Sequence, residues 1–171
     1  MIHPAYARRM AAYNQWMNDR LYGCCARLDD RERKRDVGAF FKSIHGTLNH
    51  LLLADRLWLG RFTGQPFGVR SLDQELYADF EELRTERAAT DASIRQWAHA
   101  LSEADLAGEL SYTSMVNPEP RRHPYGFAVA HFFNHQTHHR GQVTTLLAQR
   151  GIDPGVTDLI WLPEAPEPTR E

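Results

Sequence analysis

Residues 124–150 read PYGFAVAHFFNHQTHHRGQVTTLLAQR, and this stretch decides the fold. Pro124 stands at its start, and Gly151 stands directly after its end with Pro154 beyond. Proline in the first turn and glycine just past the last turn are typical of helix ends. The stretch therefore predicts a long helix that is largely apolar. A group of histidines within it departs from this apolar composition.

Three further segments predict long helices. Residues 4–28 repeat apolar side chains at three- and four-residue steps, and residues 39–62 are heavily apolar with Gly64 placed as a stop. A third helix is expected to begin near Asp73 or Leu76 and to run to Leu101. Four helices of this length without a strand ladder predict an all-α protein, a four-helix bundle with long crossover connections.

The remaining segments are short. Residues 110–116 are strand-like and residues 117–120 are typical of a turn, so we expect at most a small hairpin before the last long helix. The charged run 29–36 is expected to be a solvated connection, and Trp161 in a short turn over 157–162 is expected to cap one end of the bundle. We expect one domain over residues 1–162 and a frayed tail over 163–171.

Composition narrows the class of protein. The 171 residues include 20 Lys+Arg and 22 Asp+Glu, so a formal net charge of -2 offers no field for nucleic acid or anionic lipid. No signal peptide and no membrane-spanning run of about 18 apolar residues is visible, which predicts a cytoplasmic protein without a membrane partner. The adjacent Cys24 and Cys25 are poorly placed for a disulfide and fit a reducing compartment.

Four of the nine histidines lie between positions 131 and 139. His135 and His139 are four residues apart, so both imidazoles lie on one face of the helix and can meet one ion at about 2.0–2.1 Å. His131 lies roughly 12 Å from His139 along the axis at about 1.5 Å per residue, too far to share that ion. His131 and His138 are therefore expected to support the site or to lie at the surface.

A third ligand must come from another helix, and His50 is the best candidate. It lies in an apolar run with small side chains at helical spacing, whereas His45 lies about 140° away around the same helix at roughly 100° per residue. His45 is expected to be structural or to support a ligand. The residues alone leave two interpretations open, a metal site or hydrogen-bonded core histidines.

The segment from His131 to Gln142, with Asn49-His50 upstream and residues 151–154 (GIDP) downstream, resembles the DinB family over nearly the whole chain. The resemblance implies a four-helix bundle with one divalent metal ion, zinc or nickel, held by His50, His135 and His139. The wider superfamily is similar to thiol-dependent S-transferases and maleylpyruvate isomerase. It implies a homodimer and a small-molecule substrate used together with a low-molecular-weight thiol.

Three neutral imidazoles leave a coordination position open, as in catalytic metal sites. The first hypothesis is therefore a metal-dependent transferase or hydrolase that activates a thiol or water. Asp55, Arg140 or Gln142 could help in this reaction. Alternatively, Asp55 and Arg140 form ion pairs at helix surfaces. The second hypothesis is a non-catalytic metal-binding stress-response bundle in which the ion ties helices together. A helical dimer module without metal is the third, and it predicts that His50 lies far from His135.

The sequence argues against two classes of metalloenzyme. Gln136 follows the first histidine of the pair, where zinc peptidases of the His-Glu-x-x-His type carry the glutamate that acts as general base. The last helix lacks the Glu-x-x-His pair of di-iron carboxylate bundles, and residues 39–62 contain no glutamate.

Overall fold

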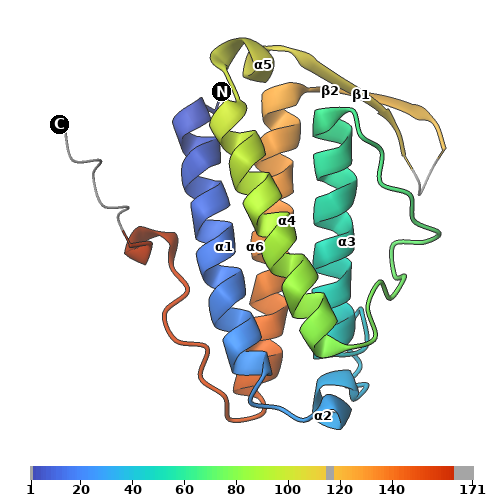
Figure 1. Cartoon of the computed structure of the whole chain (residues 1–171), viewed down its shortest axis with the longest axis vertical. Coiled ribbons are helices and arrows are strands. Elements are labelled where there is room, and N and C mark those ends of the chain that lie inside the picture. The colour runs from blue at the N-terminus through green and yellow to red at the C-terminus, as the bar shows by residue number, and fades with distance from the viewer. Residues whose placement is uncertain (1, 115–117, 164–171) are drawn as a thin grey trace.

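Four long helices lie side by side in the computed structural model, which describes residues 2–114 and 118–163 (Figure 1). They are α1 (Pro4–Cys25), α3 (Ile44–Thr63), α4 (Phe80–Ala100) and α6 (Tyr125–Ala148). Around the bundle, α1 packs on α4 and α6, and α3 packs on the same two helices. The predicted all-α four-helix bundle is confirmed.

The connection between α3 and α4, residues 64–79, runs back along the length of the bundle (Figure 1). Consequently α3 and α4 point the same way, and α1 and α6 point the opposite way. Gly64 ends α3 in the left-handed conformation with φ of 70°, where a residue with a side chain would be strained. This connection is the long crossover that the sequence predicted.

Short elements fill the other connections. A helix α2 (Asp30–Lys34) lies within the charged run, and a helix α5 (Glu103–Ala107) precedes the hairpin; neither was expected. The strands β1 (Glu109–Thr113) and β2 (Pro120–Pro124) are antiparallel, with Leu110 opposite His123. The predicted small hairpin is confirmed, although Asn117 of its expected turn lies outside the described residues, as do residues 164–171 of the expected frayed tail.

The expected start of α3 at residue 39 was wrong. Ala39 and Lys42 form an isolated bridge, and Lys42 has a φ of 66°, so the backbone reverses direction before the helix begins. Ser43 then caps α3, its hydroxyl accepting a hydrogen bond from the Gly46 amide at 3.0 Å. Phe41 is thus left outside the helix.

The expected start of α4 near Asp73 or Leu76 was also wrong, because the helix begins at Phe80. Asp79 caps it, the carboxylate accepting from the Glu82 amide at 2.9 Å. The backbone amides of Leu76 and Tyr77 are instead bound by the side-chain oxygen of Asn49 on α3, at 2.8 and 3.0 Å. A side chain on another helix therefore competes with the local helical tendency.

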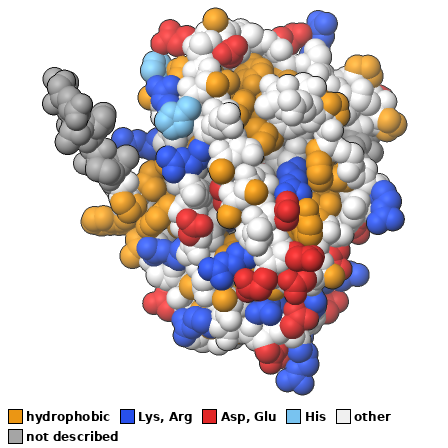
Figure 2. All heavy atoms as spheres, in the orientation of Figure 1, with side chains coloured by type: hydrophobic (Ala, Val, Ile, Leu, Met, Phe, Trp, Pro, Cys, Tyr) orange, Lys and Arg blue, Asp and Glu red, His pale blue; other side chains and the backbone are white. Residues whose placement is uncertain are grey.

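The expected cap on the bundle by Trp161 was wrong as well. A short 3-10 helix, Leu159–Trp161, does form, but Trp161 is 66% exposed and Ile160 is 83% exposed. In Figure 2, hydrophobic side chains gather at the left edge beside the grey segment, while basic and acidic side chains are intermingled over the rest of this face. Among the described residues, no helix is long and apolar enough to cross a membrane.

The core contains a buried charge network as well as apolar side chains. Arg87 on α4 donates to Asp55 on α3 at 2.7 Å and to Asp91 at 2.8 Å, and all three side chains are at most 3% exposed. Asp55 also accepts a hydrogen bond from Gln136 on α6 at 3.0 Å. Despite burial, which disfavours the charged form, the two carboxylates raise the pKa of Arg87 above its usual range.

The network extends to α1. Asn14 and Asn18 both donate to Asp91, at 2.9 and 3.0 Å, and Arg140 on α6 donates to the side-chain oxygen of Asn14. All four long helices therefore contribute a polar side chain to one buried cluster. Its two arginines balance its two carboxylates in charge.

Replacing Arg87 should destabilise the bundle strongly. In Arg87→Met the carboxylates of Asp55 and Asp91 lose their cation inside the core, which should lower the free energy of unfolding by about 3–5 kcal/mol. The matched control is Arg84→Met, one turn earlier on α4, where the side chain is 49% exposed and should contribute under about 1 kcal/mol. Chemical denaturation measures both, and equal effects of the two variants would contradict the structural role of the network.

Candidate metal centre

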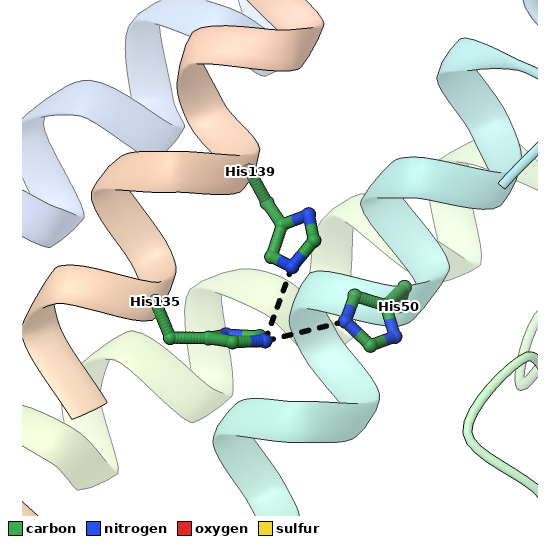
Figure 3. A group of neighbouring side chains, drawn as sticks. All are labelled: His50, His135 and His139. Carbon is green, nitrogen blue, oxygen red and sulfur yellow. Dashed lines mark hydrogen bonds between the residues drawn. The ribbon is translucent and has the colours of Figure 1, made fainter. Parts of the chain in front are cut away.

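Three histidines from two helices converge between α3 and α6. His50 projects from α3, and His135 and His139 project from neighbouring turns of α6 (Figure 3). The Nε2 atom of His135 lies 3.4 Å from that of His50 and 3.1 Å from that of His139. One nitrogen atom from each of the three side chains lies within 4.8 Å of the other two. The structure thus brings together the three histidines that the sequence singled out. The third hypothesis, a helical dimer module without metal, predicted that His50 lies far from His135, and this prediction was wrong.

Hydrogen bonds on the far side of two rings fix their protonation. The Nδ1–H of His50 donates to the Leu72 carbonyl at 2.9 Å, and the Nδ1–H of His139 donates to the side-chain oxygen of Gln142 at 2.8 Å. A neutral imidazole carries one proton, so both Nε2 atoms present lone pairs toward the centre of the group. Metal-bound histidines are typically held in this way by an acceptor on the other nitrogen.

The donor set fits a divalent ion. Around an ion held at about 2.0–2.1 Å in tetrahedral geometry, neighbouring nitrogens are about 3.3 Å apart, which agrees with the two Nε2 separations. Without a cation, His135 can donate to only one of the facing lone pairs and leaves the other unsatisfied. In the described part of the chain no further His, Cys, Asp or Glu joins the group, so an ion held there by the three histidines would have a fourth position left for solvent or substrate.

The surroundings keep the imidazoles neutral. Burial lowers the pKa of His50 to about 4, with His139 contributing further. Burial, together with its two histidine neighbours, lowers the pKa of His135 to about 3, and burial also lowers that of His139. Neutral imidazole is the form that coordinates a metal. His135 is only half-buried, so the group is accessible from the surface.

Phe41 covers one side of the group, which the sequence pattern did not predict. Its ring stacks on His50 with centroids 3.8 Å apart and planes 16° apart, and its edge meets His139 at 5.5 Å. The apolar pattern predicted Phe41 as a helical core residue. Only the chain reversal at Lys42 places it over His50 and His139.

The other histidines do not join the group. His45 is buried and its Nε2 lies 2.9 Å from the Tyr77 carbonyl and 3.1 Å from a Glu75 carboxylate oxygen, so it helps to fasten the crossover, as a structural histidine does. His131 packs against Trp58 with ring centroids 5.0 Å apart. His138 is exposed and lies 3.4 Å from the Gln142 amide nitrogen.

Asp55 and Arg140 lie in the buried network and not at helix surfaces, so the expectation of surface ion pairs was wrong. Both side chains are almost fully buried, and Asp55 is occupied by Arg87 and Gln136. Neither is available as a helper at the three histidines. Gln142, in contrast, does contact the group, because it lies within hydrogen-bond distance of His139.

The crossover of residues 64–79 supplies part of the site, and Asn49 holds it in place. Asn49 accepts from two backbone amides of this loop and donates to the Tyr77 carbonyl at 3.1 Å. Arg56 donates to the Tyr77 hydroxyl at 3.0 Å. These contacts position the Leu72 carbonyl against His50.

Comparison with known proteins identifies a family and a similar fold. A model of the DinB family matches residues 1–170. Protein DinB of Bacillus subtilis (strain 168) is 23% identical over 156 residues, which cover 90% of this chain and 91% of that protein. The crystal structure of a DinB-like protein from Bacillus cereus ATCC 10987 shares the fold with a TM-score of 0.61 at 19% identity, covering 82% of this chain and 90% of that one.

The metal-stripped protein should lose stability in mild acid. His50 and His135 have folded-state pKa values of about 4 and about 3, against about 6.5 in the unfolded chain, so the unfolded state binds more protons in between. Their contribution is fully present above pH 6.5 and is lost as the pH falls toward 4. Thermal unfolding across this range should show a steeper decline for the wild type than for a His50→Gln/His135→Gln variant. Parallel curves would show that the two imidazoles are not held neutral.

Proposed function

The chain belongs to the DinB family, and we propose that it binds one divalent metal ion through His50, His135 and His139 and uses that ion to activate a small thiol. The observation that supports this most directly is the convergence of three Nε2 atoms, two of which have their protons fixed on Nδ1 by the Leu72 carbonyl and Gln142. Zinc and nickel both suit imidazole donors, and which one is bound depends on supply.

The chain's own residues favour thiol transfer over hydrolysis. A divalent ion in this site would supply Lewis acidity, which lowers the pKa of a thiol or water that approaches it. The three ligands are neutral and leave the charge of the ion uncompensated, which favours an anionic thiolate. In residues 2–114 and 118–163 no carboxylate joins the histidines to act as a general base for water, because Asp55 is committed to Arg87. A thiol needs that help less, since it ionises more readily.

The open face of the site admits a small molecule. His135 is half-buried. Gln142, which contacts His139, also lines a pocket together with Phe40 and His138. The proposed partner is therefore a small electrophile together with a low-molecular-weight thiol. A homodimer in the cytoplasm remains part of this proposal.

A non-catalytic role is the second candidate, and the position of Phe41 favours it. Its ring covers His50 at 3.8 Å, and an ion bound by His50 and the α6 pair would cross-link α3 to α6 behind that ring. In this case the ion would mainly stabilise the bundle. Access of a thiol to the ion separates the two functions.

Metal content tests the site itself. Protein purified without a histidine tag should contain about one equivalent of a divalent metal by elemental analysis, and His135→Ala should contain little. His138→Ala is the matched control, because His138 is exposed on the same helix and should leave the content unchanged. Absence of metal from wild type after reconstitution with zinc and with nickel would overturn the proposal.

Cobalt(II) substitution tests thiol activation. Adding a small thiol to the cobalt protein should produce a near-ultraviolet thiolate-to-metal absorption band below the pH at which the free thiol ionises, near 8.5. Thiol consumption with an alkylating electrophile should then be faster with metal than without. A stable cobalt site that gives no such band, together with a higher unfolding midpoint on metal binding, would favour the structural role.

A further inference from the structure

A second feature of α3 lies three turns beyond His50 on the same face. His50, Ala54, Leu57 and Arg61 follow one another at steps of four, three and four residues, which align side chains along one stripe of a helix. Arg61 is eleven residues from His50, roughly 16 Å along the axis. Whatever Arg61 recognises therefore faces the same side of the bundle as the three histidines.

The guanidinium of Arg61 lies against two aromatic rings. Its central carbon lies 4.5 Å from the ring of Trp58 and 4.2 Å from the ring of Tyr112 on β1. The two ring centroids are 5.5 Å apart with the planes at 68°, so the rings meet on one side of the guanidinium and leave its other side to bind a partner. The arrangement fixes a positive charge at the junction of α3 and the hairpin.

No protein anion neutralises this charge in the part of the chain that the structure describes. Arg61 makes no hydrogen bond and no ion pair with residues 2–114 or 118–163. In contrast, Arg56 on α3 is paired with Glu86, and Arg87 on α4 is paired with Asp55 and Asp91. Arg61 is half-buried, and its pKa is lowered by burial with no carboxylate to offset it. The N–H groups of this half-buried guanidinium are therefore left to solvent or to a ligand.

A pocket of about 520 Å³ opens beside Arg61. Its walls are Leu57 and Gly60 on α3, the start of the crossover around Phe67, and residues 111–113 of β1. Gly60 is required there, because a Cβ at this position would lie 2.6 Å from the Gln65 carbonyl oxygen and would push the loop away. The lining contains one cation, apolar side chains and the segment of β1 from Ser111 to Thr113, and no acidic residue. The volume is that of a site for a small ligand.

We propose that Arg61 and this pocket bind the carboxylate end of a small organic molecule with an apolar body. One planar guanidinium with free edges matches a planar carboxylate in a two-point hydrogen bond, whereas a phosphate dianion would need further cations that the lining does not supply. The walls of Leu57, Pro66 and Phe67 suit an apolar chain. The site therefore takes a monocarboxylate.

The same molecule is the substrate of the three-histidine site, a step that rests on the function proposed above. Side chains link the two places without a gap: Trp58, which stacks on Arg61, lies 5.0 Å from the ring of His131, and His131 lies 6.0 Å from His135. A substrate whose reacting end faces the histidines and whose far end carries a carboxylate would span this row. Arg61 then selects the substrate and does not take part in bond making.

Octanoate and octanamide are the probes for the carboxylate site, because they differ only in charge at one end. Calorimetric titration of the metal-free protein should show octanoate binding roughly tenfold tighter than octanamide or more, as expected for hydrogen bonds to a charged group. Arg61→Met should abolish the difference, and Arg84→Met, an exposed arginine on α4, should retain it. Equal binding of the two probes, or a preference that survives in Arg61→Met, would overturn the proposal.

Chemical protection provides a test that does not depend on the folding of a variant. Phenylglyoxal modifies accessible arginines, and octanoate should slow modification of Arg61 in the wild-type protein while leaving that of Arg84 unchanged, as read by mass spectrometry. Octanamide and inorganic phosphate should not protect. Failure of octanoate to protect Arg61 would refute the site even if every variant were unstable.

A bifunctional probe separates the two proposals. With the zinc-loaded protein, ω-mercaptooctanoate should bind at least tenfold tighter than octanoate, because its thiol end reaches the ion while its carboxylate reaches Arg61. If octanoate binds through Arg61 but the thiol adds nothing, the carboxylate site stands and its link to the histidines is wrong. If no metal binds at all, the proposed function fails, and the result with octanoate still decides the carboxylate site.

Discussion

The ion pairs of Arg87 with Asp55 and Asp91 constrain the whole bundle. Charged side chains in a core are tolerated only when their partners are in place, so the four helices can pack in few registers that leave no charge unpaired. The link from Asp55 to Gln136 is the most consequential of these contacts, because Gln136 directly follows His135 on α6. Satisfying a carboxylate on α3 thereby fixes the height at which His135 and His139 face His50.

The crossover of residues 64–79 completes the arrangement from the other side. It lies along α3 because Asn49 binds its backbone, and its Leu72 carbonyl holds the proton of His50 away from the centre. Asn49 and His50 are neighbours in sequence on adjacent faces of one turn. One of them positions the loop and the other uses what the loop provides, so the crossover is part of the candidate site as well as a connection.

The sequence predicted what depends on local pattern. Helical periodicity and end signals identified four long helices, and the four-residue spacing of His135 and His139 together with the apolar setting of His50 identified the group that the structure assembles. Contacts between distant segments were missed. The start of α4 at Phe80 depends on Asn49, and the place of Phe41 depends on the reversal at Lys42. The ion pair of Arg87 with Asp55 joins two helices, and in the sequence of each helix alone the charged residue is of a type that usually lies at the surface.

The position of α6 in the chain has a consequence for biosynthesis. The ribosome makes α1, α3 and α4 first, and these three have no partner for the faces that α6 later covers, including the buried Asp55. The nascent chain therefore carries an exposed apolar groove, and Asp55 lacks its hydrogen bond from Gln136, until about residue 150 has emerged. Such an intermediate is of the kind that chaperones protect. His50 also lacks its two neighbours during this time, because His135 and His139 lie on α6. Binding of a metal ion by all three, as proposed, would thus be possible only after α6 has been made.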